Sequence, residues 1–537
     1  MGRRRRFKGR VGWRSPVLAL LLALMAPLAS GCQRDPVVPE LPDDPMEYTP
    51  VAVPETTVHW QNEMAGEATQ ETVILQARLT VDGNVHFFDV EGHPGIGAFA
   101  LSTHEDFQKA FRTRWMAASH DGDYIVKAKV TGLEPGTRYY YRLLSREGVE
   151  SEPEAGPTGT FATLDRRKAR RELTFVVVTG MNEFAFRLKS SAERKGLGFP
   201  ALETIVSHEP DFLVATGDNV YYDTPYIGRA KSIESMRARW HRQFATPRFA
   251  ALFGRLPVYW EKDDHDYRYN DADPHGSIEP SHELGAGVFR EQVPVVPPED
   301  EKAVTYRTHR INDLLQIWLL EGRDYRDSNI EPPGPDKTMW GAAQGKWLEK
   351  TLLASDAVFK ILISPTPMIG PDDKLTGIQG GILARLVGSS PIGQGGDNRK
   401  RDNHTNPHGF KDEGEAFFAW LLEHGFLERN FYIVCGDRHW QYHSIRPDGF
   451  EEFSSGALVD GNARLGRKPG DEMSTDPDAS ISQPYTQEEA SGGFLKVTVS
   501  PARGKRAATL RFDFYDENGA LLYQAEKAAR TTPAGTK

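Results

Sequence analysis

The chain has 537 residues, more than one ordinary hydrophobic core requires, so its length predicts two or more domains. The formal net charge is -10 and no long basic stripe follows the N-terminus. Both features argue against non-specific binding to nucleic acid through phosphate neutralisation. The chain has 2 cysteines, Cys32 and Cys435, which excludes a framework of several disulfide bonds.

Residues 1–31 predict a signal peptide of the lipoprotein type. Basic residues crowd the start of the chain, an apolar run covers residues 17–28, and small residues lead to Cys32. This order resembles a bacterial lipobox, in which the cysteine thiol is acylated and becomes the mature N-terminus. Ordinary signal-peptidase cleavage beside an incidental cysteine is the alternative. The apolar run is shorter than the ~20 residues that a membrane-spanning helix needs.

The segment Arg4-Arg5-Arg6-Phe7-Lys8 also resembles a twin-arginine export signal, so the Sec and Tat routes both stay open. Either route predicts an exported protein, anchored by lipid at Cys32 to the cell envelope on the periplasmic or outer-membrane side. Residues 32–54 are rich in proline, which extends a chain and prevents packing. They predict a linker that holds the globular part away from the membrane.

Residues 55–164 predict a domain of β-strands. Apolar and polar residues alternate over residues 73–79 and again over residues 124–130. A turn-forming cluster at residues 131–137 is followed by three tyrosines, Tyr139 to Tyr141. This strand–turn–strand resembles the late hairpin of fibronectin type III-like β-sandwiches, in which a tyrosine ties the corner. Residues 164–171 are basic and predict a solvated linker without a core.

Residues 172–525 predict an α/β domain, because apolar runs typical of strands alternate with amphipathic segments typical of helices. The expected strands cover residues 173–178, 212–215, 256–260, 314–320, 358–363 and 431–435. The expected helices cover residues 200–208, 344–354 and 415–424, and strands return at 494–499 and 508–515.

Three of the expected strands run into residues that can bind metal. The segments are Gly217-Asp218-Asn219-Val220-Tyr221, Asp263-Asp264-His265-Asp266 and Gly436-Asp437-Arg438-His439. Ligands bind beyond the carboxyl ends of strands in α/β sheets, so three such endings predict one site. Carboxylates suit hard cations and imidazole suits transition metals. A pair of metal ions can clamp a phosphate and activate water, while a nearby histidine protonates the leaving oxygen.

With these motifs the sequence resembles the PhoD-like alkaline phosphatase branch of the metallophosphoesterase superfamily. Further matching elements follow in the family's order: Asp263-Asp264-His265-Asp266-Tyr267 with Asn270-Asp271, Arg323-Asp324-Tyr325-Arg326, and Gly341 with Gln344 and Trp347-Leu348. The resemblance implies a four-layer αββα catalytic domain after the β-sandwich. It also implies two metal ions, iron or calcium or both, with other divalent metals as alternatives.

The resemblance assigns a role to each site residue. Asp218 would bridge the two metals, Tyr221 would bind one through its phenolate, and Asp264 would bind the second. Asp437 and His439 would complete the metal shell, and His265 would assist the leaving group or hold the phosphate. Arg323 would neutralise the phosphate, with a structural salt bridge to a neighbouring acid as the alternative.

One position departs from the family pattern. The family places a cysteine ligand to iron after the first catalytic strand, whereas this chain has Met181 there. A thioether is a poor ligand for a ferric ion, so Met181 is interpreted as a packing residue. Either Asn182 supplies an oxygen instead, or this site binds a different metal or binds weakly. The long glycine-rich stretch 370–410, with His404 and His408, is expected to cover the site.

The sequence therefore predicts an exported, membrane-tethered metallophosphoesterase that hydrolyses phosphate esters. Monoesters and diesters are not separated by these motifs. The alternative is a surface-anchored binding lipoprotein whose phosphatase domain has degenerated, which the residue Met181 favours and the intact acids and histidines oppose.

Overall fold

The computed structural model describes residues 59–300, 302–375 and 399–530. The predicted signal peptide, Cys32 and the linker 32–54 lie outside the described residues, as does most of the glycine-rich stretch. No helix among the described residues is long and apolar enough to cross a membrane.

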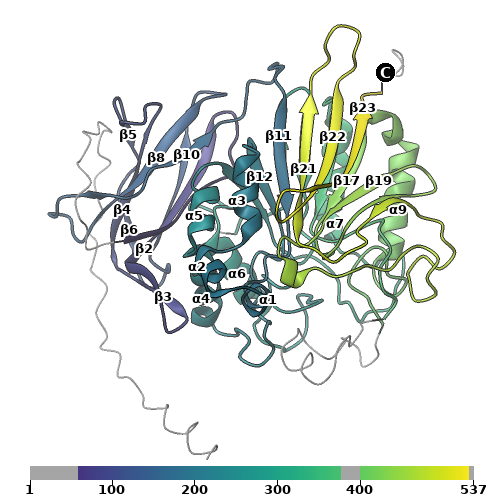
Figure 1. Ribbon diagram of the computed structural model, residues 1–537, viewed down its shortest axis with the longest axis horizontal. Helices are drawn as coiled ribbons and strands as arrows, with labels where there is room; N and C mark the ends of the chain where they lie inside the picture. Colours follow the sequence, from purple (N-terminus) through teal and green to yellow (C-terminus); the bar gives the residue numbers. More distant parts are fainter. Residues whose placement is uncertain (1–58, 301, 376–398, 531–537) are drawn as a thin grey trace, which may run out of the picture. The chain divides into compact units, whose positions relative to one another are not determined.

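A β-sandwich forms the first part of the described chain (Figure 1). One of its sheets contains β1 (His59–Gly66), β2 (Thr72–His86), β3 (Asp89–Gly92) and β7 (Ile125–Thr131). The other contains β4 (Gly95–Ser102), β5 (Phe111–Arg112), β6 (Met116–Ala118), β8 (Arg138–Arg146), β9 (Glu154–Ala155) and β10 (Gly159–Ala162). Apolar side chains from both sheets share one core, including Leu75 and Val126 from the first and Phe99 and Leu143 from the second.

The predicted hairpin of the sandwich is wrong in its pairing. Strand β7 pairs with β2, whereas β8 pairs with β4 and β10 in the opposite sheet, so residues 131–137 cross between sheets. The periodicity marked both strands correctly but carries no information about their partners. The tyrosine tie is present, because the backbone N–H of Glu134 donates a 2.9 Å hydrogen bond to the hydroxyl of Tyr139. Likeness to fibronectin type III domains stays a prediction.

The part of the chain for which the sequence predicts catalysis, called the catalytic part below, is built on two sheets. The larger sheet has the order β23-β22-β21-β11-β12-β13-β1-β2-β3, with β7 attached to β2. Its strands outside the sandwich are β11 (Leu173–Val178), β12 (Phe212–Thr216), β13 (Pro257–Glu261), β21 (Gly493–Ser500), β22 (Thr509–Asp516) and β23 (Leu521–Ala528). Strand β1 pairs in parallel with β13, so a strand of the sandwich extends the catalytic sheet. The predicted domain boundary falls between β10 and β11.

The second sheet has the order β14-β15-β16-β17-β19-β18-β20. Its strands are β14 (Arg307–Arg310), β15 (Leu315–Leu319), β16 (Phe359–Ser364), β17 (Phe431–Cys435), β18 (Gln441–Ile445), β19 (Glu451–Ser455) and β20 (Ser482–Thr486). Side chains of this sheet and of the larger one form a common buried core, with Phe175 and Val214 on one side and Ile317 and Ile361 on the other. The two sheets therefore pack face to face.

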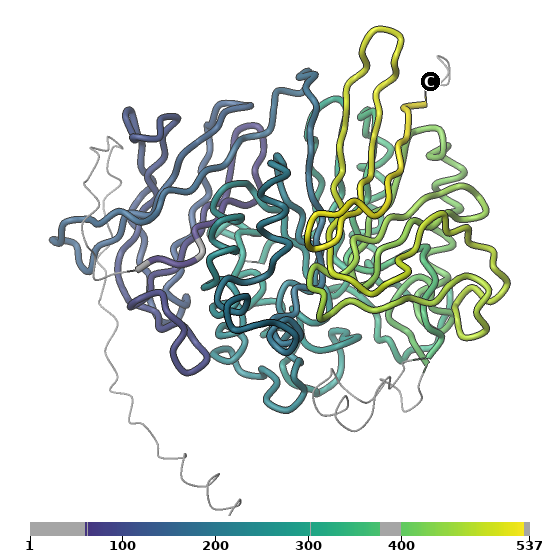
Figure 2. The backbone as a smooth tube through the Cα atoms, viewed as in Figure 1, coloured from purple at the N-terminus to yellow at the C-terminus, as the bar shows by residue number. Residues whose placement is uncertain are grey.

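Helices cover the outer face of each sheet. The larger sheet packs against α3 (Pro200–Ser207), α4 (Ile233–Phe244), α5 (Pro247–Phe253) and α6 (His282–Gln292). The second sheet packs against α7 (Gly341–Ala354) and α9 (Lys411–Glu423). Short helices α1 (Glu183–Lys189), α2 (Ala192–Leu197), η1 (Phe426–Arg429) and η2 (Asp460–Asn462) complete the elements. The layer order is helix, sheet, sheet, helix. Figure 2 traces the backbone through these layers in the same view as Figure 1.

The basic segment between the two parts is more structured than the sequence indicated. Leu164 is buried in the core shared by the two sheets. Arg167 forms ion pairs with Asp313 at 3.1 Å and Asp356 at 2.9 Å. Arg171 pairs with Asp165 and Asp211. Residues 165–172 are otherwise mostly exposed, as the sequence predicted, so only the burial of Leu164 and the ion pairs of the arginines go beyond a solvated linker.

Candidate metal centre

The backbone at two strand ends turns sharply to present carboxylates. Gly217, Asp218 and Asp437 have φ angles of 74°, 55° and 57°, in the left-handed region that side chains other than glycine rarely adopt. Such strain is concentrated at functional sites. A Cβ atom at Gly436 would lie 2.4 Å from the carbonyl oxygen of Thr216, so glycine is required where β17 and β12 approach. This contact brings the ends of the two sheets together.

Asp218, Tyr221 and His439 form one polar group. The hydroxyl of Tyr221 lies 2.9 Å from Asp218 Oδ2 and 3.1 Å from His439 Nε2. His439 Nε2 lies 3.1 Å from the same Asp218 oxygen. Burial, followed by the nearby charge of Arg464, lowers the pKa of His439 well below its usual 6.5. The imidazole is therefore neutral, as a metal ligand must be.

Asp218, Asp264 and His265 form a second group that shares Asp218 with the first. These three residues are buried and offer ligand atoms that all lie within 4.8 Å of one another. His265 Nε2 is 3.9 Å from Asp264 Oδ1, while its Nδ1 is 2.7 Å from Asp223 Oδ1. The imidazole of His265 also stacks on the ring of Tyr221, with ring centroids 4.2 Å apart.

The residues of both groups fit bound metal ions. Asp218 Oδ1 and Asp264 Oδ1 are buried and have no hydrogen-bond partner among the described residues. Burial and the neighbouring carboxylates raise the pKa of Asp218 well above its usual 3.8, despite the opposing charge of His265. Buried charges without partners are costly unless they coordinate a cation. Two unpaired carboxylate oxygens beside two imidazoles therefore match a centre for metal ions.

The last strand contributes two residues with different surroundings. His439 contacts Asp218, as described above. Asp437 Oδ2 instead accepts a 2.6 Å hydrogen bond from Arg438, whose other nitrogen lies 3.0 Å from Asp372. Lys400 also pairs with Asp372 at 3.0 Å. Arg438 thus occupies one oxygen of Asp437, and a ligand role for Asp437 stays a prediction.

The first strand end places Met181 and Asn182 differently. Met181 is fully buried in the core between the larger sheet and its helices. The side-chain oxygen of Asn182 accepts a hydrogen bond from Ala185 and caps helix α1. Its amide nitrogen lies 3.3 Å from Asn462 Oδ1, and Asn462 in turn donates a 2.8 Å hydrogen bond to the hydroxyl of Tyr221. Asn182 is therefore linked to Tyr221 through Asn462 and belongs to neither of the two groups.

Arg323 is fully buried and lies 2.6 Å from Asp263, which is the salt-bridge alternative that the sequence left open. A different arginine is exposed at the centre. The backbone N–H of Arg464 donates a 3.0 Å hydrogen bond to the carbonyl of His439, and its guanidinium lies 5.2 Å from the Trp440 ring centroid. No ion pair of Arg464 occurs within the described parts of the chain.

Three residues of this site were not found from the sequence. Asp223 lies within the same loop as Asp218 and Tyr221, so its short spacing could have suggested it. Asn462 and Arg464 belong to an irregular segment without a motif, and only the fold brings them to His439 and Tyr221. His404, which the sequence placed on a covering loop, is buried and pairs with Glu413 at 2.9 Å.

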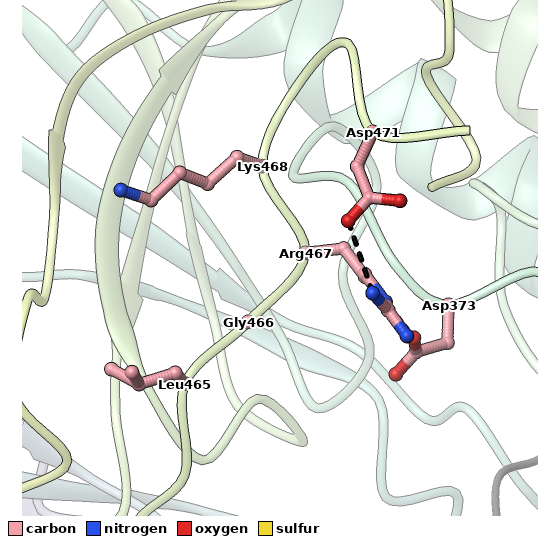
Figure 3. A pocket seen from close by; sticks show the side chains of 6 residues that line it. All are labelled: Asp373, Leu465, Gly466, Arg467, Lys468 and Asp471. Atoms are coloured by element: carbon pink, nitrogen blue, oxygen red, sulfur yellow. Dashed lines mark hydrogen bonds and ion pairs between the residues drawn. The ribbon is translucent and has the colours of Figure 1, made fainter. Parts of the chain in front are cut away.

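A polar cavity of about 340 Å³ is lined by residues that follow Asp372 and Arg464 in the chain. Its lining consists of Asp373, Leu465, Gly466, Arg467, Lys468 and Asp471. Figure 3 shows the guanidinium of Arg467 between the carboxylates of Asp373 and Asp471, with Lys468 pointing to the opposite side. Arg467 is therefore neutralised within the protein, whereas Lys468 is exposed.

Comparison with known proteins places this architecture in a family. The family model "PhoD-like phosphatase" matches residues 175–503, and the model of its N-terminal domain matches residues 61–165. Alkaline phosphatase D of Bacillus subtilis (strain 168) is 21% identical over 334 residues, which are 56% of this chain and 54% of that protein. The chain thus spans about half the length of this curated relative.

Two solved structures share the fold. A structure of PhoD has a TM-score of 0.63 and 18% identity, covering 90% of this chain and 95% of that one. Purple acid phosphatase PPD1 from yellow lupin (Lupinus luteus) seeds has a TM-score of 0.52 and 13% identity, covering 89% and 77%. Because the family model matches more than half of its length, the chain belongs to the PhoD-like phosphatase family.

Proposed function

We propose that this protein is a metal-dependent phosphoesterase that hydrolyses phosphate esters at the centre around Asp218. The observation that carries the proposal is the position of Asp218, which belongs to both groups of ligand atoms and keeps one buried oxygen without a hydrogen bond among the described residues. Metal ions held there would stabilise negative charge on phosphate and supply an activated water. Iron and calcium are the proposed metals, with other divalent ions as alternatives.

His265 is suited to protonate the leaving oxygen. Burial alone lowers its pKa, but the carboxylates of Asp223, Asp264 and Asp218 outweigh burial and raise the pKa well above the usual 6.5. The imidazole is therefore protonated near neutral pH, the form that a general acid needs. Asp223 holds Nδ1, which leaves Nε2 directed to the side of Asp264 and Asp218.

Arg464 is the proposed contact to the substrate's phosphate, in place of the buried Arg323. Its guanidinium is exposed beside His439, and a forked guanidinium matches phosphate oxygens. Arg323 instead compensates Asp263 and Asp264 beneath the centre. We further propose that the protein is exported and held to the cell envelope by lipid on Cys32, as the N-terminal sequence indicates.

The test measures metal content and hydrolysis of p-nitrophenyl phosphate and bis(p-nitrophenyl) phosphate. Asp218→Asn should lose metal and lower kcat/KM by more than ~100-fold, since even residues behind metal ligands contribute ~10- to 100-fold. Arg464→Ala should raise KM and keep the metal. Asp121→Asn, an equal change at an exposed acid of the sandwich, should behave as wild type. A wild-type protein without metal and without turnover after reconstitution would support the binding-lipoprotein alternative.

A further inference from the structure

The hairpin between β2 and β3 exposes an unusual group of apolar side chains. Phe87 is 101% exposed and Phe88 79% exposed, and Val81 and Val85 on the same hairpin are 39% and 42% exposed. Singly exposed apolar residues are ordinary, whereas a cluster of this kind on one projection marks an interaction site. None of these four residues belongs to the metal centre.

The two phenylalanines occupy positions for which their side chains are poorly suited. Phe87 and Phe88 link the two strands, with His86 paired to Asp89, and have φ angles of 49° and 75°. A two-residue hairpin of this type requires positive φ at both central residues and therefore favours Asn-Gly. Bulky residues at positive φ are strained, so local folding preferences do not account for these aromatic rings.

The catalytic part holds the hairpin tip in place. Arg242 of helix α4 donates a 3.2 Å hydrogen bond to the carbonyl of Phe88 and pairs with Glu183 at 2.9 Å. His241 of the same helix lies 2.6 Å from Asp89. The exposed rings are thus displayed on a fixed backbone, which lowers the entropy cost of binding through them.

The surface chemistry of the tip suits a lipid interface without net charge. Two acids of the hairpin are each paired with an imidazole, Asp82 with His86 at 2.6 Å and Asp89 with His241 at 2.6 Å, while Glu91 on β3 is exposed. Aromatic rings are favoured at the boundary between lipid and water. The chain's net charge of -10 opposes attraction to anionic lipids.

The N-terminal end of the described chain lies beside the base of this hairpin, and the predicted anchor precedes it in the sequence. Strand β1 begins at His59, and His59 pairs with Thr80, at the base of the hairpin. The pairing is irregular between Thr80 and Val85, and the partner strand spans the same distance from Gly92 to Asp89, ~10 Å at ~3.3 Å per residue. The proline-rich residues between Cys32 and His59 can span up to ~80 Å when extended. An anchor at the N-terminus therefore leaves the hairpin tip within reach of the same membrane.

From these observations we infer that the β2–β3 hairpin is a membrane-docking element, whose tip residues Phe87 and Phe88 insert into a zwitterionic lipid surface. The N-terminal anchor would keep the protein at the membrane, and the hairpin would fix its orientation there. The inference does not depend on the metal centre.

The test places a fluorescent reporter on the hairpin of the full chain. A nitrobenzoxadiazole dye on Asn84→Cys reports insertion by a blue shift. Cys435 is buried and spared from labelling, and the acylated form of the chain is used, in which Cys32 has no free thiol. The labelled full chain is inserted through its N-terminal segment into phosphatidylcholine vesicles. We expect a blue shift on the hairpin and none for the same dye on Lys505→Cys, in the loop between β21 and β22.

The decisive variant is Phe87→Asn with Phe88→Gly, which suits the turn and removes both rings. It should keep or raise the melting temperature and leave phosphatase activity unchanged, but abolish the blue shift. The fraction of hairpins inserted should fall roughly tenfold for each ring removed. A blue shift that persists in this variant overturns the inference. A blue shift without vesicles, accompanied by dimers in solution, also overturns it in favour of a second copy of the chain.

Discussion

At the scale of single residues, the proposed proton donor His265 is paired with Asp223. Asp223 uses one carboxylate oxygen at 2.7 Å from His265 Nδ1 and the other to accept a 2.8 Å hydrogen bond from the backbone of Asn270. An asparagine at position 223 can keep an acceptor for the backbone but loses the negative charge. Asp223→Asn therefore removes the negative charge and largely preserves the shape of the loop.

We expect Asp223→Asn to lower kcat by ~10- to 100-fold with metal content unchanged. The carboxylate of Asp223 raises the pKa of His265, so its loss lowers that pKa. If His265 acts in the protonated form, as we propose, activity should decline at a lower pH than in wild type as the pH rises. The measurement is kcat against pH, with metal analysis of each variant.

His265→Ala serves as the companion variant for this prediction. It should lower turnover while metal content stays largely intact. Loss of metal in His265→Ala would instead identify His265 as a ligand, which its place in the group with Asp218 and Asp264 also permits. An unchanged pH profile in Asp223→Asn would contradict the assigned role of the pair.

Much of this site was predictable because its residues follow strands directly. Asp218, Asp264 and His439 each follow a buried strand within four residues, so the topology alone brings them together. Arg464 and Asn462 were not predictable, since no periodicity marks the segment that carries them. The ion pair of Arg323 with Asp263 was one of two alternatives, and only the burial of both groups distinguishes them.

At the scale of elements, strand positions were predictable and strand partners were not. The expected strands at 173–178 and 431–435 match β11 and β17, because continuous apolar runs fit strands buried on both faces. Sequence periodicity does not show that β7 pairs with β2 or that β1 joins β13. Pairing depends on contacts between residues far apart in the chain, which local patterns do not encode.

Strand β1 carries a half-buried acid at this junction. The pairing of β1 with β2 is irregular between Gln61 and Met64, as in a β-bulge, and Glu63 lies in this stretch. Glu63 lines a small cavity with Phe249 and Phe253 of helix α5, and its Oε1 has no hydrogen-bond partner among the described residues. Burial raises the pKa of Glu63 from 4.5 to about 7.

This shift makes the stability of the junction depend on pH. The folded protein retains the proton of Glu63 up to about pH 7, while the unfolded chain loses it near pH 4.5. The free energy of unfolding therefore falls as the pH rises between these values. Glu63→Gln should raise it by ~1–2 kcal/mol at pH 8 and leave it unchanged at pH 4, as measured by denaturant titration. Glu91→Gln, at an exposed acid on β3, is the control, and equal effects of Glu63→Gln at both pH values would contradict the prediction.

At the scale of the whole molecule, the sandwich and the catalytic part share one sheet through β1 and β13. Helix α4 adds a second connection, since His241 lies 2.6 Å from Asp123 of the sandwich. The sandwich is thus fixed to the catalytic part, and the hairpin that we propose to dock on lipid moves with the metal centre. The membrane attachment that we propose would then depend on the N-terminal segment.

Lipid on Cys32 should dominate that attachment. An acyl chain contributes ~0.8 kcal/mol for each buried CH₂ group, whereas burying a phenylalanine contributes ~1.5–3 kcal/mol. Cys32→Ser should therefore release the active protein from the membrane fraction, while Phe87→Asn with Phe88→Gly should leave it there. The measurement is phosphatase activity in soluble and membrane fractions, with Cys435→Ser as the control for a cysteine buried in β17. A Cys32→Ser protein that stays in the membrane fraction would contradict acylation as the anchor. If that protein still contains residues 17–28, an uncleaved signal segment would account for its retention.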